Sequence, residues 1–356
     1  MLIQRNLLID TLSINIGIAG KGNNLPVLQN VLVESGEKAS FFATDTSVSI
    51  RISPQLELDY RGKFLIPKTL LEAIKTFESE MIDVEITGSK LLVSQGKTNI
   101  EFTPHDVLDY PEFKEPGQYN SELEISGGDL LEIIEKVSFT AANGNEAIKH
   151  SLNGIYLEGK EGKITACGTN GCRMAIFQKE VPNAEFDGIV IPKEVLPEMK
   201  RVVNKVDTIK LKIADTKIIL EKDGLFFAAN LIDDTYPDFK SIIPDDLEQK
   251  LTVEKNAFVK GIKMVMTIIE KTEPIKVTVT GNKMELGAEN DTGTIKRVIA
   301  VETEDCKEFG INPVFLLDAI SHIEANKICM EFSEKERKPV MIRNEGYTHL
   351  IMPVIL

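Results

Sequence analysis

The sequence repeats one pattern three times, a proline followed by apolar residues at helical spacing. The prolines are Pro67, Pro192 and Pro313, and they lie 125 and then 121 residues apart. Positions four, seven and ten after each proline are apolar, which predicts one buried face of a helix that begins at the proline. These positions hold Leu71, Ile74, Phe77, Leu196, Met199, Val202, Leu317, Ile320 and Ile323. A period of this length indicates a repeated domain rather than a short solenoid motif.

Other markers recur around the prolines in the same order. Thr44-Asp45 returns as Thr169-Asn170 and, more weakly, as Glu289-Asn290. A strand-like segment at 90–93 returns at 217–220, and the Tyr-Pro-acid-Phe segment at 110–113 returns at 236–239. Because several markers keep their order and nearly constant spacing, we predict a threefold internal repeat.

A threefold repeat in 356 residues predicts three domains, with boundaries at 1–121, 122–247 and 248–356. Each domain is long enough to bury its own hydrophobic core. Within one unit the pattern alternates helix, strands, helix and strands. We therefore expect an α+β fold in which two helices cover one face of a mainly antiparallel sheet.

Units of this kind leave sheet edges available for pairing. Three units in a row can join edge to edge, but the outer edges of the first and third units then remain unpaired. A head-to-tail homodimer with twofold symmetry closes both edges. We therefore expect a ring of six domains, with the helices lining the hole and the sheets on the outside.

The composition is that of a soluble globular chain, with 42% hydrophobic and 27% charged residues and no long apolar run. The N-terminus lacks the features of a signal peptide, so we expect a cytoplasmic protein with no membrane partner. The four cysteines contain no CxxC pair and the four histidines are scattered. We therefore expect no metal site and no cofactor.

The net charge of −14 argues at first against binding to nucleic acid. Charge can nevertheless be segregated, and basic side chains gather on the second proline helix, where Lys193, Lys200 and Arg201 lie. Lys68 follows the first proline in the same way. On charge alone, the favoured interpretation is that these residues form ordinary solvated helix faces.

No catalytic motif is evident. The glycine-rich segment at 17–22 has neither the spacing nor the hydroxyl residue of a phosphate-binding P-loop. Asp233-Asp234 could hold a metal in principle, but aspartates before Tyr-Pro are typical of turns. Two functional alternatives remain open from the residues. One is a scaffold that binds peptides without meeting DNA, and the other is an enzyme with an unrecognised site near Cys172 and Arg173.

Over its whole length the chain resembles the bacterial sliding clamp, the beta subunit of replicative DNA polymerase III. The matching segments are 25–30, Thr44-Asp45, Leu152-Asn153-Gly154, Thr169-Asn170-Gly171-Cys172-Arg173-Met174-Ala175, 236–239, 243–244 and 352–356. The resemblance implies a non-catalytic processivity factor, a homodimeric ring around double-stranded DNA at the nucleoid. Sliding requires contacts to phosphates without sequence-specific contacts to bases. The implied partners are the polymerase III catalytic subunit, the clamp loader, and other polymerases and repair proteins.

The resemblance also implies a hydrophobic pocket between the second and third domains that receives short peptides from these partners. Carried over by position, the pocket residues are Leu152, Thr169, Gly171, Cys172, Arg173, Met174, Pro237, Ile242, Pro339, Leu350, Met352 and Val354. Aliphatic and thioether walls suit an apolar peptide anchor. The alternative interpretation is that Leu152, Ile242, Leu350 and Met352 are simply core residues.

The chain departs from the family pattern at several of these positions. Asn170 and Cys172 stand where the family often has aspartate and histidine, and Ser241 stands where a basic residue is common. The C-terminus also lacks a common penultimate arginine. These changes make the expected pocket less charged and put its peptide preference in doubt.

The resemblance supplies two further sets of residues. For the dimer interface it implies Ile100 and Phe102 against the 264–269 stretch, with Ile268 and Ile269 as contacts. An obligate interface should be apolar, and these residues are. The residues expected to face DNA are Lys21, Lys68, Lys193, Lys200 and Arg201.

Overall fold

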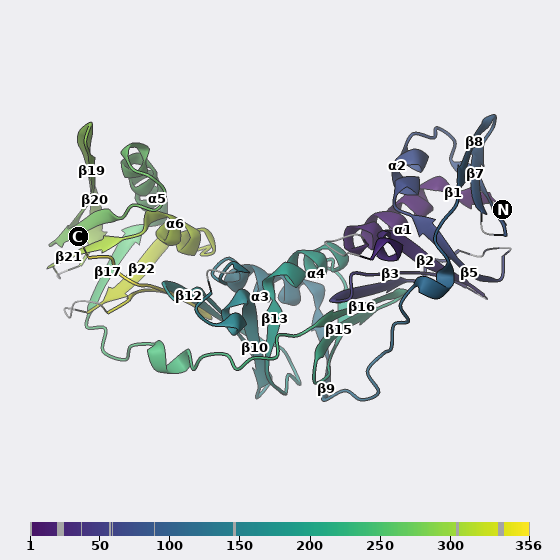
Figure 1. Cartoon of the computed structure of the whole chain (residues 1–356). Coiled ribbons are helices and arrows are strands. Elements are labelled where there is room, and N and C mark those ends of the chain that lie inside the picture. Colours follow the sequence, from purple (N-terminus) through teal and green to yellow (C-terminus); the bar gives the residue numbers. More distant parts are fainter. Residues whose placement is uncertain are drawn as a thin grey trace. The chain divides into compact units, whose positions relative to one another are not determined.

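The computed structural model describes residues 2–19, 25–36, 38–56, 58, 60–88, 90–144, 147–303, 306–333 and 338–355, without the side chain of Cys306. The chain divides into two compact units, Met1–Leu131 with Glu194–Leu231 and Glu132–Lys193 with Ile232–Leu356. Each unit is described by itself, and Figure 1 labels their elements.

The first unit contains two antiparallel sheets in its described residues. The larger has the strand order β5 (Gly62–Pro67), β2 (Asn30–Ser35), β3 (Ala39–Thr44), β4 (Val48–Ile52), β16 (Leu225–Asn230), β15 (Lys217–Lys222), β14 (Thr208–Ile213), β9 (Ser121–Ser126). The smaller has the order β1 (Leu2–Gln4), β6 (Met81–Thr87), β7 (Lys90–Gln95), β8 (Thr98–Phe102). Its helices are α1 (Arg5–Ile18), α2 (Thr69–Lys75), α4 (Leu196–Val202) and the start of α3 (Gly127–Ser138).

Helices α1 and α2 bury their apolar faces against strands of both sheets. Leu12 and Ile74 are fully buried in one hydrophobic cluster with Val33, Ile82 and Val93. Burial of an aliphatic side chain of this size contributes about 1.5 to 3 kcal/mol. The two helices therefore hold the two sheets of the first repeat around one core.

The second unit contains one long antiparallel sheet. Its order is β13 (Phe186–Pro192), β10 (Gly154–Lys160), β11 (Lys163–Thr169), β12 (Arg173–Glu180), β24 (Tyr347–Ile351), β23 (Val340–Asn344), β22 (Lys327–Phe332), β17 (Gln249–Glu254), β20 (Gly293–Glu302), β19 (Lys283–Asn290), β18 (Ile275–Thr280), β21 (Cys306–Ile311). Its helices are α5 (Lys255–Val265), α6 (Pro313–Ser321) and the rest of α3. The expected α+β fold with antiparallel sheets is confirmed.

The prediction that each proline begins a helix holds only in the third repeat. There Pro313 is the first residue of α6, and the Asn312 side chain accepts hydrogen bonds from the next two backbone N–H groups. Pro67 and Pro192 instead end the edge strands β5 and β13. Proline suits an edge strand because it has no N–H to leave unpaired. The helices α2 and α4 follow a short distance later.

The predicted apolar helix faces are buried at every position except Leu317, and in the third repeat Ile320 and Ile323 are buried as predicted. Leu71 and Ile74 are buried, as are Leu196 and Met199. In the third repeat the prediction for Leu317 was wrong, because Leu317 is half-buried and Leu316 is the fully buried residue. Helix α6 starts on the proline itself, so its inward face begins one residue earlier.

The Thr-Asp marker forms the same turn in all three repeats. In each copy the side-chain oxygen at the acid or amide position accepts hydrogen bonds from the backbone N–H groups two and three residues later. The distances are 2.9 and 2.7 Å for Asp45, 3.1 and 3.1 Å for Asn170, and 2.9 and 3.0 Å for Asn290. This Asx turn explains why the marker recurs, since aspartate and asparagine make it equally well.

Neighbouring repeats are joined through their sheets, as expected from the edge argument. β4 pairs with β16, with Val48 opposite Ala229. β12 pairs with β24 in the same way, with Arg173 opposite Ile351. Each junction therefore uses the same two strands of the repeated fold, the strand after the Asx turn and the last strand of the next repeat.

Candidate functional site

The predicted pocket residues lie around the pairing of β12 with β24 in the second unit. This pairing places Met174 opposite Leu350, and both side chains are buried. They share one apolar cluster with Leu152, Tyr236 and Phe239. The structure therefore brings together side chains from β12, from β24 and from the segment that follows β16.

Apolar side chains with large exposed fractions belong to the same predicted set. Ile242 is 53% exposed, Met352 is 39% exposed and Val354 is 40% exposed. The core interpretation therefore holds for Leu152 and Leu350, which are buried, and fails for Ile242 and Met352. Exposed apolar side chains next to a buried apolar cluster are typical of a surface that receives a ligand.

The Asx turn of the second repeat fixes the backbone between these residues. Gly171 has φ +88°, and its N–H donates to the Thr169 hydroxyl at 3.1 Å. The Cys172 side chain is exposed, and the backbone carbonyl of Cys172 accepts a hydrogen bond from the Met352 N–H at 2.9 Å. The turn and the C-terminal segment are thus held side by side. Pro237 is half-buried and Pro339 is buried.

The sequence prediction missed three residues of this region. Ile148 is 91% exposed, and a Cβ atom at Gly171 would lie 3.8 Å from its Cδ1 atom. No sequence pattern marks Ile148. Tyr236 stacks with Tyr156 at a ring-centroid distance of 5.2 Å, and Phe239 meets Tyr156 edge to face at 5.5 Å. Their signal was the repeated Tyr-Pro-acid-Phe segment.

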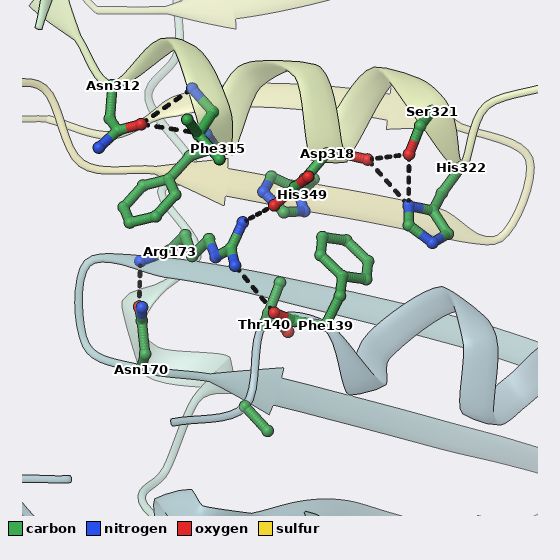
Figure 2. A network of polar contacts seen from close by, with 12 residues as sticks. Phe139, Thr140, Asn170, Arg173, Asn312, Phe315, Asp318, Ser321, His322 and His349 are labelled. Atoms are coloured by element: carbon green, nitrogen blue, oxygen red, sulfur yellow. Dashed lines mark hydrogen bonds and ion pairs between the residues drawn. The ribbon is translucent and has the colours of Figure 1, made fainter. Parts of the chain in front are cut away.

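Arg173 was expected among the pocket residues, but its side chain is 11% exposed and its charged group contacts other parts of the second unit. Figure 2 shows its guanidinium reaching from β12 to α6, where Nη1 lies 2.5 Å from an Asp318 carboxylate oxygen. Nη2 donates to the Phe139 carbonyl at 2.8 Å. The guanidinium also stacks over the rings of Phe315, at 4.3 Å, and Phe139, at 5.4 Å. Arg173 therefore ties β12 to α6 and to the end of α3.

Two histidines flank this arginine. The His322 ring stacks on Phe139 with centroids 4.1 Å apart, and the His349 ring lies parallel to Phe139 at 5.7 Å. His349 is fully buried, and its Nδ1 lies 3.1 Å from the Tyr347 hydroxyl. Burial, with a smaller contribution from Arg173, lowers the pKa of His349 to about 3. The imidazole is therefore neutral at physiological pH.

The basic residues expected to face DNA differ in their surroundings. Lys68 is exposed and Lys200 is half-buried. Arg201 is paired with Glu198 at 3.2 Å. Lys193 donates to the Ala141 carbonyl and the Asn143 side chain, at 2.6 and 2.7 Å. Lys21 lies outside the described residues.

The four residues expected at the dimer interface are half-buried. Ile100 and Phe102 lie on β8 and pack at the margin of the first repeat's core. Ile268 ends the short 3-10 helix Met266–Ile268 that follows α5, and Ile269 comes next.

Within the described ranges, no group of three or more His, Cys, Asp or Glu side chains is arranged to hold a metal ion. A search of the same ranges finds no helix with the length and apolar character needed to cross a membrane.

Three family models match the chain in order. They describe the N-terminal domain of the DNA polymerase III beta subunit at residues 1–114, the central domain at 124–238 and the C-terminal domain at 240–355. Among curated relatives, the beta sliding clamp of Caulobacter vibrioides is 25% identical, covering 99% of this chain and 98% of the relative. That of Pseudomonas putida is also 25% identical and covers 99% of both chains.

Solved structures show the same fold. The DNA polymerase III subunit beta from Pseudomonas aeruginosa matches with a TM-score of 0.94 at 22% identity, covering 100% of both chains. The DNA polymerase sliding clamp from Caulobacter crescentus matches with a TM-score of 0.92 at 22% identity, covering 100% of this chain and 99% of that one.

A repeated α+β fold joined through sheet edges, with three consecutive family domains, defines a processivity clamp rather than an enzyme. The chain belongs to the DNA polymerase III beta subunit family, the bacterial sliding clamps, as the sequence resemblance predicted. It is a non-catalytic subunit of the replication machinery.

The buried neutral His349 predicts a specific acid sensitivity of the second unit. Its folded pKa of about 3 lies below the ordinary value of 6.5, so the unfolded chain binds the proton more readily. Stability contributed by this group is present above pH 6.5 and falls as the pH drops toward 3. Between pH 7 and pH 5 we expect a loss of about 2 kcal/mol in the free energy of unfolding from this one group.

Denaturant unfolding of the chain and of His349→Gln at both pH values measures this effect. The variant should be less stable at pH 7 but should lose about 2 kcal/mol less on acidification. An equal loss in both proteins would mean that His349 does not carry the acid sensitivity.

Proposed function

We propose that this chain forms a homodimeric ring of six domains around duplex DNA and tethers its partners by short peptides bound near Met352. The domains of each protomer are 1–121, 122–247 and 248–356. The ring is supported by the strand pairing at the two junctions within one chain. At each junction the strand after an Asx turn pairs with the last strand of the next repeat, and the same pattern leaves one complementary pair of strands for a second copy.

The two strands left over are β20 and β8. β20 follows the Asx turn of the third repeat and so corresponds to β4 and β12. Within the described residues it pairs along its length with β19, and on its other side only Val301 and Glu302 pair, with β17. β8 is the last strand of the first repeat and corresponds to β16 and β24; among the residues that the structure describes it pairs only with β7.

The repeat also predicts the register of this pairing between protomers. Superposing the Asx turns aligns Gly293 with Arg173 and Val48, and superposing the hairpin turns aligns Phe102 with Ile351 and Ala229. Phe102 of one copy then lies opposite Gly293 of the other. Two positions further along, Ile100 lies opposite Ile295, which joins two half-buried apolar side chains across the seam.

The same register places charges of opposite sign together. Glu101 lies opposite Thr294, and the diagonal neighbour on its face is Lys296, which is within reach of a long side chain. The Asn290 side chain donates a hydrogen bond to the Ile268 carbonyl, which holds Ile268 and Ile269 close to the start of β20. These two residues would extend the apolar seam. Closing both free edges in this way also removes two sites of aggregation.

The peptide site rests on the exposed apolar side chains beside the buried Leu152, Met174 and Leu350. Ile242, Met352 and Val354 offer an apolar surface, and Thr169, Gly171, Cys172, Pro237 and Pro339 complete its surroundings. A leucine or aromatic anchor of a partner peptide would cover this surface. Arg173 would act by holding β12 in place, since its charged group is paired with Asp318.

We infer the partners from this site and from the ring. They are the polymerase III catalytic subunit, the clamp loader, and other polymerases and repair proteins with such peptides, acting in the cytoplasm at the nucleoid. Lys21, Lys68, Lys193, Lys200 and Arg201 would face the DNA phosphates. Since Lys193 and Arg201 also hold protein groups, each would give only part of its hydrogen-bonding capacity to DNA.

The register gives the first test. In a Cys172→Ser background that removes an exposed natural thiol, Asn99→Cys combined with Lys296→Cys should form a disulfide between protomers. Facing residues of an antiparallel pair have Cα atoms about 4.5 to 5.5 Å apart, within the range for a disulfide. Non-reducing electrophoresis after mild oxidation should show a covalent dimer.

The matched controls shift the second cysteine by one residue, using Asn99→Cys with Ile295→Cys or with Arg297→Cys. Neighbouring side chains of a strand point to opposite faces, so these pairs should cross-link poorly. Efficient cross-linking of a shifted pair would contradict the proposed seam. Failure of all three pairs to cross-link would contradict it as well.

The peptide site gives the second test. Met352→Ala combined with deletion of residues 354–356 should weaken binding of polymerase and clamp-loader peptides by a factor of about 10 or more, because truncation of a contact at the centre of such a site costs more than about 1 kcal/mol. Fluorescence anisotropy with labelled peptides measures the affinity, and native mass spectrometry should still show the dimer.

Val206→Ala is the control, because Val206 is 93% exposed and lies in the other unit. It should leave peptide affinity unchanged. If the Met352 variant bound peptides as tightly as the control, the pocket assignment would be wrong.

A further inference from the structure

A cavity of about 430 Å³ lies in the first repeat, which belongs to the first unit, whereas Met352 belongs to the second. Its walls come from β5, from the neighbouring strands β6 and β7, and from the segment that follows β8. The lining residues are Lys63, Phe64, Leu65, Ile86, Gly88, Lys90, Leu91 and 103–107. The volume falls in the range of sites that hold small ligands or a short peptide.

The strand β5 presents a free edge to this cavity. It is the terminal strand of the eight-stranded sheet and pairs only with β2 in the described residues. Backbone groups of alternate residues point away from β2, and Pro67, which has no N–H, fits such an outward position. Leu65 and Lys63 lie two and four residues before Pro67 on the same strand, so their N–H and C=O groups also point away from β2, toward the cavity.

The other two repeats fill the corresponding place with their own chain. Val190 occupies the position of Leu65, and its carbonyl accepts the Ile232 N–H at 2.9 Å. Gly310 occupies it in the third repeat, and its carbonyl accepts the Val354 N–H at 2.8 Å. In each case the donor belongs to the segment that follows the repeat's last strand.

In the first repeat this contact is missing from the described part of the chain. The segment at 103–107 forms the far wall of the cavity, and no backbone hydrogen bond joins it to β5. Asp106 instead caps its own short 3-10 helix, Val107–Asp109, by accepting the Leu108 N–H at 2.9 Å. The cavity is therefore the space that a strand segment fills in the two sister repeats.

We propose that an extended peptide of a partner protein occupies this cavity by adding to the free edge of β5, with an apolar residue followed by acidic ones. Strand addition supplies backbone hydrogen bonds at an exposed edge, and pockets for alternate side chains supply selectivity. The segment that fills this place in the second repeat continues as Ile232-Asp233-Asp234, which has that character.

Two lysines line the cavity and each is already paired with a glutamate, so an acidic peptide would have to displace Glu34 and Glu101 from them. These lysines are Lys63 and Lys90, with side chains 57% and 56% exposed. Asp106 is the acidic residue in the lining. Phe64, Leu65 and Ile86 supply apolar surface for the residue before the acids. The inference is independent of the peptide site near Met352.

The probe is a labelled peptide that copies residues 229–235 of this chain, Ala-Asn-Leu-Ile-Asp-Asp-Thr. Fluorescence anisotropy with the full-length protein should show saturable binding, and a peptide with both aspartates replaced by lysine should bind at least 10-fold more weakly. The combined variant Lys63→Glu and Lys90→Glu should lower affinity for the original peptide at least 10-fold. Lys114→Glu, the same charge change at an exposed position outside the cavity, should not.

A backbone variant tests strand addition itself. Lys63→Pro removes the outward N–H, whereas Lys63→Ala removes only the charge. The proline variant should bind the peptide at least 5-fold more weakly than the alanine variant, with circular dichroism and thermal unfolding confirming that both fold. In the unmodified protein, NMR shifts on peptide addition should fall on 63–65 and 103–107.

Three results would overturn the proposal. They are no saturable binding at millimolar peptide, equal affinity in all the Lys63 variants, and loss of binding on Met352→Ala with no effect of the Lys63 and Lys90 changes. The last result would place the peptide at the Met352 surface and leave the proposed function intact.

Discussion

Antiparallel pairing between the sheets of neighbouring repeats is the interaction on which this protein depends. β4 with β16 and β12 with β24 use the same two strands of the fold. In each pair one strand directly follows an Asx turn and the other directly follows a hairpin turn. Backbone hydrogen bonds in this arrangement require little of the side chains. The repeats can therefore diverge in sequence while each junction keeps its geometry.

The second junction shows how side chains add to this pairing. The Arg173 side chain extends from β12, which carries part of the proposed peptide surface, and is held between two aromatic rings and an aspartate of α6. Such a stacked, paired guanidinium is not replaceable by lysine without loss of both contacts. The surface near Met352 is thus built on a backbone that Arg173 secures, which would suit the proposed binding of several partner peptides.

The repeat, the fold class and the sheet-to-sheet junctions could be predicted because each has a local sequence signal. Proline served poorly as a helix start in two repeats, since it suits the end of an edge strand such as β5 equally well. The partner of Arg173 lies 145 residues away, so no local pattern could reveal that its charge is already used. The cavity beside β5 lies where the first repeat lacks, in its described residues, a hydrogen bond that the other two repeats make. Only comparison of the three folded repeats reveals this difference.

The central claim is that the protein holds DNA by topological linkage, with a ring closed through β8 and β20. The most direct measurement loads the protein with its clamp loader onto nicked circular duplex DNA, washes at high salt and then linearises the circle. Electrostatic contacts weaken steeply with salt, whereas linkage does not. The account predicts retention on the circle after the wash and release on cutting. Loss from circular and linear DNA alike during the wash would contradict it.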